Sequence, residues 1–265
     1  MARKRKKNKK MKITLAALAL AVLVLGGAAV TGTDGGNGAD SGNSAVSAES
    51  GEVSGGNGEA AASGEGSGED GSPVIDKNDE YLVLINKTHT VGSDYVPADL
   101  VVPKYYADRS YEGYRKMRQV AADAYDELVE GAKAAGYDIR LTSAYRSYYA
   151  QETLYNNYVA KDGQAAADRY SAKPGTSEHQ SGLTADVSAA SVNWRLTQDF
   201  GDTDEGKWLA AHAHEYGFII RFPEGKEDIT GYMYEPWHIR YVGKEHAKCI
   251  YEQQTTLEEY LGEVD

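Results

Sequence analysis

The first 75 residues of this 265-residue chain contain no aromatic side chain, and this asymmetry limits where a folded core can form. All 20 tyrosines lie at or after Tyr81. Residues 76–265 must therefore supply the core and the chemistry, and about 190 residues is an ordinary size for one domain. We predict that residues 76–265 form a single folded domain.

Residues 13–30 form an apolar run, ITLAALALAVLVLGGAAV, in which only Thr14 is polar. Eighteen helical residues span about 27 Å, close to the ~30 Å hydrocarbon core of a bilayer. Eight Lys and Arg side chains in residues 1–12 precede the run, which predicts a cytoplasmic basic tail and an extracytoplasmic location for the rest. The run favours an uncleaved transmembrane anchor, which would attach the protein to the cell membrane. A cleaved signal sequence, which would give a secreted protein, is the alternative.

Residues 31–75 consist mainly of Gly, Ser, Ala, Asn and acidic side chains. Such a segment cannot bury enough apolar surface to offset the entropy lost on ordering. We therefore predict a disordered linker, with a root-mean-square span of roughly 35–40 Å if it behaves as a Gly-rich coil. A tether of that kind would let the folded domain reach away from the membrane.

The charge distribution argues against nucleic-acid binding. Residues 1–12 carry eight positive charges and residues 31–75 carry eight negative ones (+8 − 8 = 0), so residues 76–265 hold the whole net charge of −12. An acidic domain repels phosphate backbones. The single cysteine, Cys249, excludes an intrachain disulfide framework and a zinc site built from thiolates.

Hydrophobic periodicity and Gly or Pro boundaries predict alternating strands and helices in the folded domain. Without a regular βαβ repeat, the order of elements predicts an α+β fold with a mostly antiparallel sheet flanked by helices. The predicted strands are 81–86, 137–145, 183–188, 218–222 and 237–242; the predicted helices are 111–135, 147–160, 205–216 and one or two within 243–261.

Four of the six histidines have surroundings that favour structural roles. His212 and His214 lie in a predicted helix, where residues two apart point about 200° apart and cannot share a metal ion. His246 follows two charged residues on a predicted exposed turn, and His89 lies in a polar loop.

His179 and His238 have neighbours that suit a metal site. In SEHQSGLTADVS, His179 precedes Asp186 by seven residues, and Gly182 lies between them, so the backbone can turn tightly. In EPWHIRYV, Glu235 precedes His238 by three residues. Residues three apart in a regular strand face opposite sides. We therefore expect Glu235 in a bend before the strand, beside His238.

Two histidines and one aspartate form a three-ligand set that leaves a fourth zinc position open for water. Bound zinc lowers the pKa of water to about 7. His179, Asp186 and His238 are the predicted ligands, and Glu235 is the predicted general base and acid. Arg146, at the end of the predicted strand 137–145, is the candidate cation opposite the developing oxyanion.

These residues resemble the VanY-type D-alanyl-D-alanine carboxypeptidase family of zinc metallopeptidases. The resemblance runs over roughly residues 80–250 and includes the segments NKTHTVGSDYVPADLV, LTSAYRSYYAQ, SEHQSGLTADVS and YGFIIRFPEGKEDITGYMYEPWHIRYVG, in that order. It implies a small α+β zinc fold of the DD-peptidase/hedgehog-like type. It also implies removal of the terminal D-alanine from peptidoglycan stem peptides.

The resemblance adds two residues to the expected site: Ser177 and Gln151 would contact the substrate peptide. The sequence departs from the family at Thr184, where alanine is usual, and at Phe222, where tyrosine is often found. If that tyrosine hydroxyl binds the substrate carboxylate, its absence weakens the assignment of the cleaved end.

Three functions stay open at this point. The first is a D,D-carboxypeptidase, acting as a monomer on stem peptides. The second is an L,D-carboxypeptidase or an endopeptidase on the same scaffold. The third is a zinc-bearing wall-binding domain without activity, which would need neither Glu235 nor Arg146.

Overall fold

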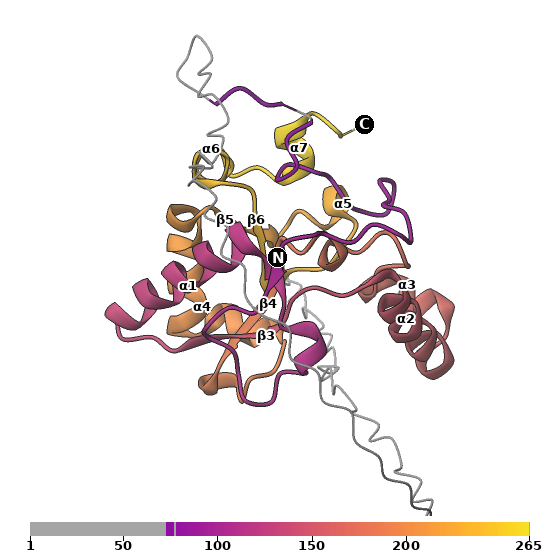
Figure 1. Ribbon diagram of the computed structural model, residues 1–265, viewed down its shortest axis with the longest axis horizontal. Coiled ribbons are helices and arrows are strands. Elements are labelled where there is room, and N and C mark those ends of the chain that lie inside the picture. Colours follow the sequence, from indigo (N-terminus) through magenta and orange to yellow (C-terminus); the bar gives the residue numbers. More distant parts are fainter. Residues whose placement is uncertain (1–72, 77, 265) are drawn as a thin grey trace, which may run out of the picture. The chain divides into compact units, whose positions relative to one another are not determined.

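Four antiparallel strands in the order β3–β4–β6–β5 form the main sheet, which lies between helices (Figure 1). The structure is a computed structural model that describes residues 73–76 and 78–264. The predicted basic tail, the apolar run 13–30 and the linker up to residue 72 lie outside this range. Within the described residues, no helix has the length and apolar character needed to cross a membrane.

All paired strands run antiparallel, which confirms the predicted sheet type. A separate two-stranded sheet pairs β1 with β2. The strands are β1 (Leu100–Val101), β2 (Met117–Arg118), β3 (Ile139–Ser143), β4 (Thr184–Ala189), β5 (Phe218–Phe222) and β6 (Glu235–Tyr241).

Helices flank the sheet, and in Figure 1 α1 and α4 lie on the opposite side of the view from α2 and α3. The helix bounds are α1 (Gln119–Ala134), α2 (Tyr148–Asp162), α3 (Gln164–Tyr170), α4 (Asp204–His212), α5 (Glu227–Thr230), α6 (Lys244–Gln253) and α7 (Leu257–Leu261). The predicted helix 205–216 corresponds to α4 followed by a short 3-10 helix that ends at Gly217, whose positive φ requires the conformation glycine adopts freely.

Strand alternation gives the main sheet one apolar face and one polar face. On β4, Ala185, Val187 and Ala189 join the core formed with α1 and α4. Side chains of successive strand residues point to opposite faces. Asp186 therefore lies on the other face, where it is directly paired with His238 of β6. The functional residues and the apolar core thus occupy opposite sides of the same strands.

The predicted strand 81–86 is wrong. The described chain has no strand there, although Leu82 and Ile85 are buried as a core segment would be. The carbonyl groups of Tyr81 and Val83 accept hydrogen bonds from Nη2 of Arg240, at 3.0 and 2.8 Å. The guanidinium group of Arg240 thus supplies the hydrogen bonds that these carbonyls would accept from a neighbouring strand in a sheet.

The predicted helix 111–135 begins later than expected, because the backbone before Gln119 is engaged elsewhere. The N–H of Arg118 donates to the carbonyl of Gly182, and that of Gln119 donates to the carbonyl of Asp99. Met117, which lies within the predicted helix, is buried but belongs to β2. The C-terminal segment does form two helices, α6 and α7, separated at Gln254 by a left-handed backbone.

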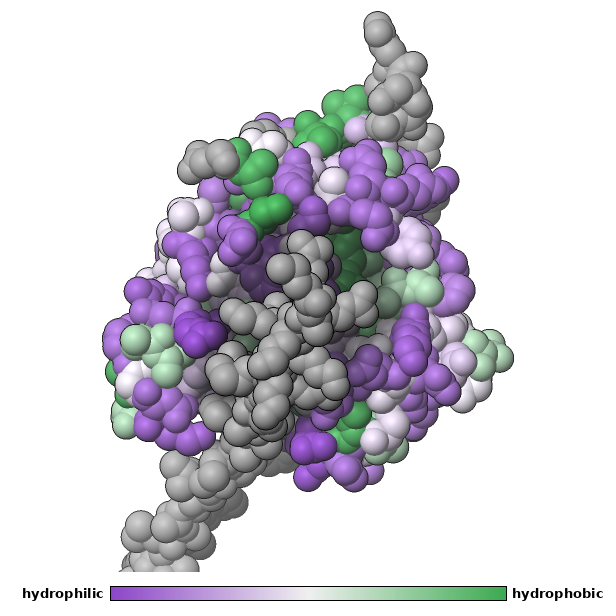
Figure 2. Space-filling view, turned by 180° about the vertical axis from the view of Figure 1, so that it is seen from behind, coloured by the Kyte–Doolittle hydropathy of each residue, from purple (hydrophilic) through white to green (hydrophobic). Residues whose placement is uncertain are grey.

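The surface seen in Figure 2 is mostly hydrophilic, with apolar side chains in small separate groups. This distribution agrees with a domain whose apolar side chains are largely used in two internal clusters, one under α1 and one around α6 and α7.

Candidate metal centre

Three buried side chains converge on the polar face of the sheet. Ligand atoms of His179, Asp186 and His238 all lie within 4.8 Å of one another. Asp186 comes from β4 and His238 from β6, where the two residues pair across the strands. His179 comes from a 3-10 helix, Glu178–Ser181, that directly precedes β4. The structure thus brings together the three residues that the sequence predicted as metal ligands.

Gly182 makes the tight turn between the 3-10 helix and β4. It has a φ of 71°, in the left-handed region that disfavours other residues. A Cβ atom at this position would lie 2.9 Å from a methyl carbon of Leu100. The turn therefore needs glycine for two reasons, and it returns His179 to the vicinity of Asp186.

The two histidines present different ring nitrogens to Asp186. Nδ1 of His179 lies 2.7 Å from the carbonyl oxygen of Ala144, which can only accept, so Nδ1 carries the hydrogen. Its Nε2 lies 3.2 Å from Oδ2 of Asp186. In His238, Nδ1 lies 3.0 Å from Oδ1 of Asp186. A metal ion in this cleft would therefore meet Nε2 of His179 and Nδ1 of His238.

The electrostatics of the cleft favour a bound cation. Burial opposes ionisation of Asp186, but both histidines outweigh it and hold the pKa of this carboxyl well below its usual range. Burial lowers the pKa of His179. Burial also disfavours charged His238, yet the neighbouring carboxylates of Asp186 and Glu178 outweigh this and raise its pKa to about 9. Positive charge is thus stabilised beside Asp186.

Glu235 lies beside His238, with 3.8 Å between its Oε2 and Nδ1 of His238. The expected bend before the strand is wrong, because Glu235 is the first residue of β6 and pairs with Phe222. An irregularity in the β5–β6 pairing adds two residues to β6 between Glu235 and Ile239. This bulge lets residues three apart face the same side. Burial raises the pKa of Glu235 to about 8.

Arg146 follows β3 and is fixed beside the cluster. Its backbone N–H donates to the carbonyl of His179 at 3.1 Å. Its Nη1 donates to Oε1 of Gln151 at 2.7 Å, and Nη2 donates to Ser143 at 3.2 Å. Its Nε is buried and has no hydrogen-bond partner among the described residues. Arg146 thus keeps an unused donor beside the predicted metal site.

Gln151 and Ser177, the predicted substrate contacts, are both buried. The amide of Gln151 is used at both ends within the chain, since its Nε2 also donates to the carbonyl of Ala172 at 2.6 Å. Gln151 therefore positions Arg146. Ser177 immediately precedes the 3-10 helix that carries His179.

The other four histidines lie outside the cluster, as the sequence predicted. His89 contacts Asn86, and His246 contacts Tyr260. The remaining two lie in or after α4: His212 contacts Glu215, and His214 stacks on Tyr251.

A family model described as VanY, D-alanyl-D-alanine carboxypeptidase, matches residues 114–244, which include every residue of the cluster. The putative carboxypeptidase YodJ of Bacillus subtilis (strain 168) is 44% identical over 198 residues, which cover 74% of this chain and 72% of that protein. The chain belongs to the VanY family. It is therefore a carboxypeptidase of that family.

Other peptidases are also similar to it. The bifunctional D-Ala-D-Ala dipeptidase and carboxypeptidase VanXYC of Enterococcus gallinarum is 36% identical, with 68% of this chain and 92% of that protein covered. The LD-carboxypeptidase LdcB superposes with a TM-score of 0.67 at 43% identity, covering 74% of this chain and 92% of that one. A VanY D,D-pentapeptidase variant solved with Zn(II) superposes with a TM-score of 0.58 at 32% identity, covering 69% and 99%.

The VanY-type donor set in this chain has the chemistry that zinc prefers. Two imidazoles and one carboxylate leave a fourth position open, as in catalytic zinc sites. The second nitrogen of His179 is already bonded to a backbone carbonyl, an arrangement typical of metal-bound histidine. Asp186 presents one carboxylate oxygen to each histidine, so negative charge lies where the cation would sit.

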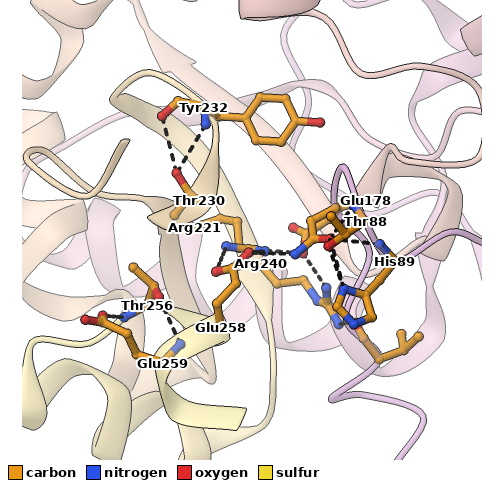
Figure 3. Close-up of polar contacts among 12 residues, drawn as sticks. Thr88, His89, Glu178, Arg221, Thr230, Tyr232, Arg240, Thr256, Glu258 and Glu259 are labelled. Carbon is orange, nitrogen blue, oxygen red and sulfur yellow. Dashed lines mark hydrogen bonds and ion pairs between the residues drawn. The ribbon is translucent and has the colours of Figure 1, made fainter. Parts of the chain in front are cut away.

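Sequence reasoning missed a buried ionic network that adjoins this site in the VanY fold. Figure 3 shows Arg221 between the carboxylates of Glu178 and Glu258, and Arg240 on Glu178. The signal was present, because FIIRF and WHIRYV each place an arginine inside an apolar strand. Buried charges are almost always paired, so each arginine predicts a buried acid.

Proposed function

We propose that this protein is a zinc-dependent carboxypeptidase that removes the terminal D-alanine from peptidoglycan stem peptides. One observation carries the proposal: His179, Asp186 and His238 converge within 4.8 Å, and Glu235 lies 3.8 Å from the last of them. The related VanY D,D-pentapeptidase solved with Zn(II) supports the choice of metal.

His179, Asp186 and His238 are the residues that would hold the zinc ion. Zinc, when bound, supplies Lewis-acid chemistry, polarising a carbonyl group and lowering the pKa of water to about 7. The buried carboxylate of Asp186 offsets part of the cation's charge. The carbonyl of Ala144 holds the His179 ring so that Nε2 faces the cleft.

Glu235 is the proposed general base and acid. Its carboxyl group would accept a proton from the water that attacks the peptide carbonyl, and would then give that proton to the departing amine. Burial raises its pKa to about 8, which suits a group that must both take and return a proton near neutral pH. Its side chain is 13% exposed, so substrate and water can reach it.

Arg146 is the proposed partner of the negative charge that develops on the carbonyl oxygen or that the substrate's carboxylate carries. Its Nε is buried and has no partner in the part of the chain that the structure describes, and Gln151 holds Nη1 in place. A preorganised donor of this kind stabilises the transition state without rearrangement. The role of Gln151 is therefore to position Arg146. Ser177 is the proposed contact of the substrate peptide.

An L,D-carboxypeptidase is the second candidate, favoured by similarity to LdcB. That LD-carboxypeptidase is 43% identical to this chain, whereas the VanY D,D-pentapeptidase is 32% identical. Both reactions would release a terminal D-alanine, but from peptides of different length. The ring centroid of Phe222 lies 4.8 Å from that of His238. Phe222 has no hydroxyl group that could bind the carboxylate of the substrate, and this difference bears on which peptide end the site recognises.

The test is mass analysis of a defined stem pentapeptide and tetrapeptide after incubation with the zinc-loaded full-length chain. Loss of one alanine from the pentapeptide supports D,D-cleavage, and loss of one alanine from the tetrapeptide supports L,D-cleavage. Glu235→Gln is the matched control and should release neither. If zinc is bound and neither peptide loses alanine, or only larger fragments are cut off, the proposal is wrong.

We also propose that the enzyme acts outside the cytoplasm, attached to the membrane through residues 13–30. The basic tail and apolar run of the sequence support this placement. Protease treatment of intact cells and of lysed cells tests it. Digestion of the catalytic domain in intact cells supports the proposal, and digestion only after lysis contradicts it.

A further inference from the structure

The second ring nitrogen of His238 faces a buried carboxylate. Nε2 of His238 is buried and has no hydrogen-bond partner among the described residues. Oε2 of Glu178 lies 3.5 Å from it, slightly beyond a normal hydrogen bond. Glu178 itself is 3% exposed. An acidic group is therefore directed at the one nitrogen of His238 that the metal cluster does not use.

Glu178 is held in this position by charges on two strands. Its Oε1 accepts hydrogen bonds from Nε of Arg221 and from Nη1 of Arg240, both at 2.7 Å. Arg221 is in turn fixed by two bonds to Glu258 of α7, at 2.8 and 2.6 Å (Figure 3). The other oxygen, Oε2, accepts a long hydrogen bond from the hydroxyl of Thr184 at 3.5 Å and lies at the same distance from Nε2 of His238.

The two histidines of the cluster need opposite tautomers. His179 carries its hydrogen on Nδ1, which faces the carbonyl of Ala144, so its Nε2 is free for a metal ion. His238 presents Nδ1 to Asp186, so its hydrogen must stay on Nε2 when Nδ1 binds a metal. Nothing in its own strand fixes that choice, and Glu178 is the acceptor placed to do so.

We propose that Glu178 is a positioning residue that holds His238 in the tautomer with hydrogen on Nε2, directing Nδ1 at the metal. This inference rests on the proposed zinc-dependent function. Carboxylates that accept the free N–H of a metal-bound histidine fix its orientation and raise its basicity as a ligand. The arginine network thereby links the metal site to α7, through Glu258.

Zinc affinity of the full-length chain, measured by competition with a chelator, tests the inference. In Glu178→Gln, the amide oxygen is expected to face the two arginines and the NH₂ group to face Nε2, which disfavours hydrogen there. Glu258→Gln is the matched control, because it removes the other acid of the network without touching His238. We expect zinc affinity to fall about 10- to 100-fold in Glu178→Gln and to change less than about twofold in Glu258→Gln.

Equal losses in the two variants would show a purely structural role and would overturn the inference, as would unchanged affinity in Glu178→Gln. A second measurement does not depend on how the variants fold. Nitrogen-15 NMR of histidine in the zinc-loaded wild-type chain should find hydrogen on Nε2 of His238 and on Nδ1 of His179. Hydrogen on Nδ1 of His238 would overturn the inference. Failure of the proposed hydrolysis would instead appear as bound zinc without D-alanine release.

Discussion

Asp186 and His238 are directly opposite each other on adjacent antiparallel strands, with 3.0 Å between Oδ1 and Nδ1. Side chains of residues so paired point to the same face of a sheet. The register of β4 against β6 therefore assembles two thirds of the proposed metal site before any loop is considered. A slip of one residue would turn one of the two ligands to the apolar face.

Replacement of Glu235 should separate catalysis from metal binding. We expect Glu235→Ala to bind zinc as the wild type does but to lose about 10²–10⁴ in kcat, the usual contribution of a general base. His238→Ala should lose zinc as well as activity, whereas His212→Ala, outside the cluster, should change neither. Metal analysis of the purified variants and the rate of D-alanine release check these outcomes. Full activity of Glu235→Ala would contradict the mechanism.

Zinc binding should release a proton from His238. Its pKa is raised to about 9 in the metal-free protein, so it is charged at pH 7 and must lose one proton to bind zinc. His179, whose pKa is lowered by burial, is already neutral. Glu235 also has a raised pKa, so its own titration would add to the protons counted. The variant Glu235→Gln removes that contribution.

In Glu235→Gln, calorimetry at pH 7 in buffers of different ionisation enthalpy should therefore find about one proton released per zinc. Zinc affinity should weaken about tenfold for each unit by which the pH falls below 8. Release of no proton, or affinity independent of pH between 6 and 8, would count against the site as described.

Gln151 should act through Arg146. Gln151→Ala removes the acceptor that holds Nη1, and we expect kcat to fall by roughly tenfold or more, but less than in Arg146→Ala, where loss of the donor should cost about 10²–10³. Zinc content should be unchanged in both. Glu152→Ala, one residue along α2 and exposed, is the control. An unaltered kcat in Gln151→Ala would show that Arg146 needs no such support.

The buried ionic network should matter for folding. Arg221→Met leaves Glu178 and Glu258 buried without their shared partner, and we expect the free energy of unfolding to fall by about 3–5 kcal/mol at pH 7. Exposed pairs contribute far less, so Lys244→Met, which removes the surface pair with Glu127, should cost about 0–1 kcal/mol. Chemical denaturation checks both values. Equal small losses would mean that the network is not stabilising.

The same network predicts how stability depends on pH. Burial raises the pKa of Glu178, but Arg221, Arg240 and His238 outweigh it and hold that pKa well below its usual value of 4.5. A depressed pKa in the folded state adds stability that is complete above 4.5 and is lost as the pH falls through the folded value. Arg221→Met should therefore lose less stability than the wild type between pH 5 and pH 3, which the same denaturation series can measure.

Local patterns predicted most of the main sheet and the proposed ligands. Apolar alternation located the strands 218–222 and 237–242 nearly at their observed bounds, because those residues are buried by neighbouring strands. His179 and Asp186 are seven residues apart, so their meeting depends on one turn at Gly182. Signals of this range can be read from sequence.

The features that the sequence did not predict are contacts between residues far apart along the chain. Glu178 meets Arg221 and Arg240, 43 and 62 residues away, and Arg221 meets Glu258, 37 residues away. No local pattern specifies such partners. Segment 81–86 is as apolar as a strand, but its carbonyls bind Arg240, 157 and 159 residues further on. The bulge at the start of β6 likewise depends on its pairing with β5.

Diffraction at the zinc absorption edge from crystals of the zinc-loaded protein tests the central claim most directly. A single anomalous peak is predicted about 2.0–2.2 Å from Nε2 of His179, a carboxylate oxygen of Asp186 and Nδ1 of His238, with Glu235 beside it but not bound. A peak bound by other residues, or no peak among these three side chains in a protein shown to contain zinc, would contradict the account.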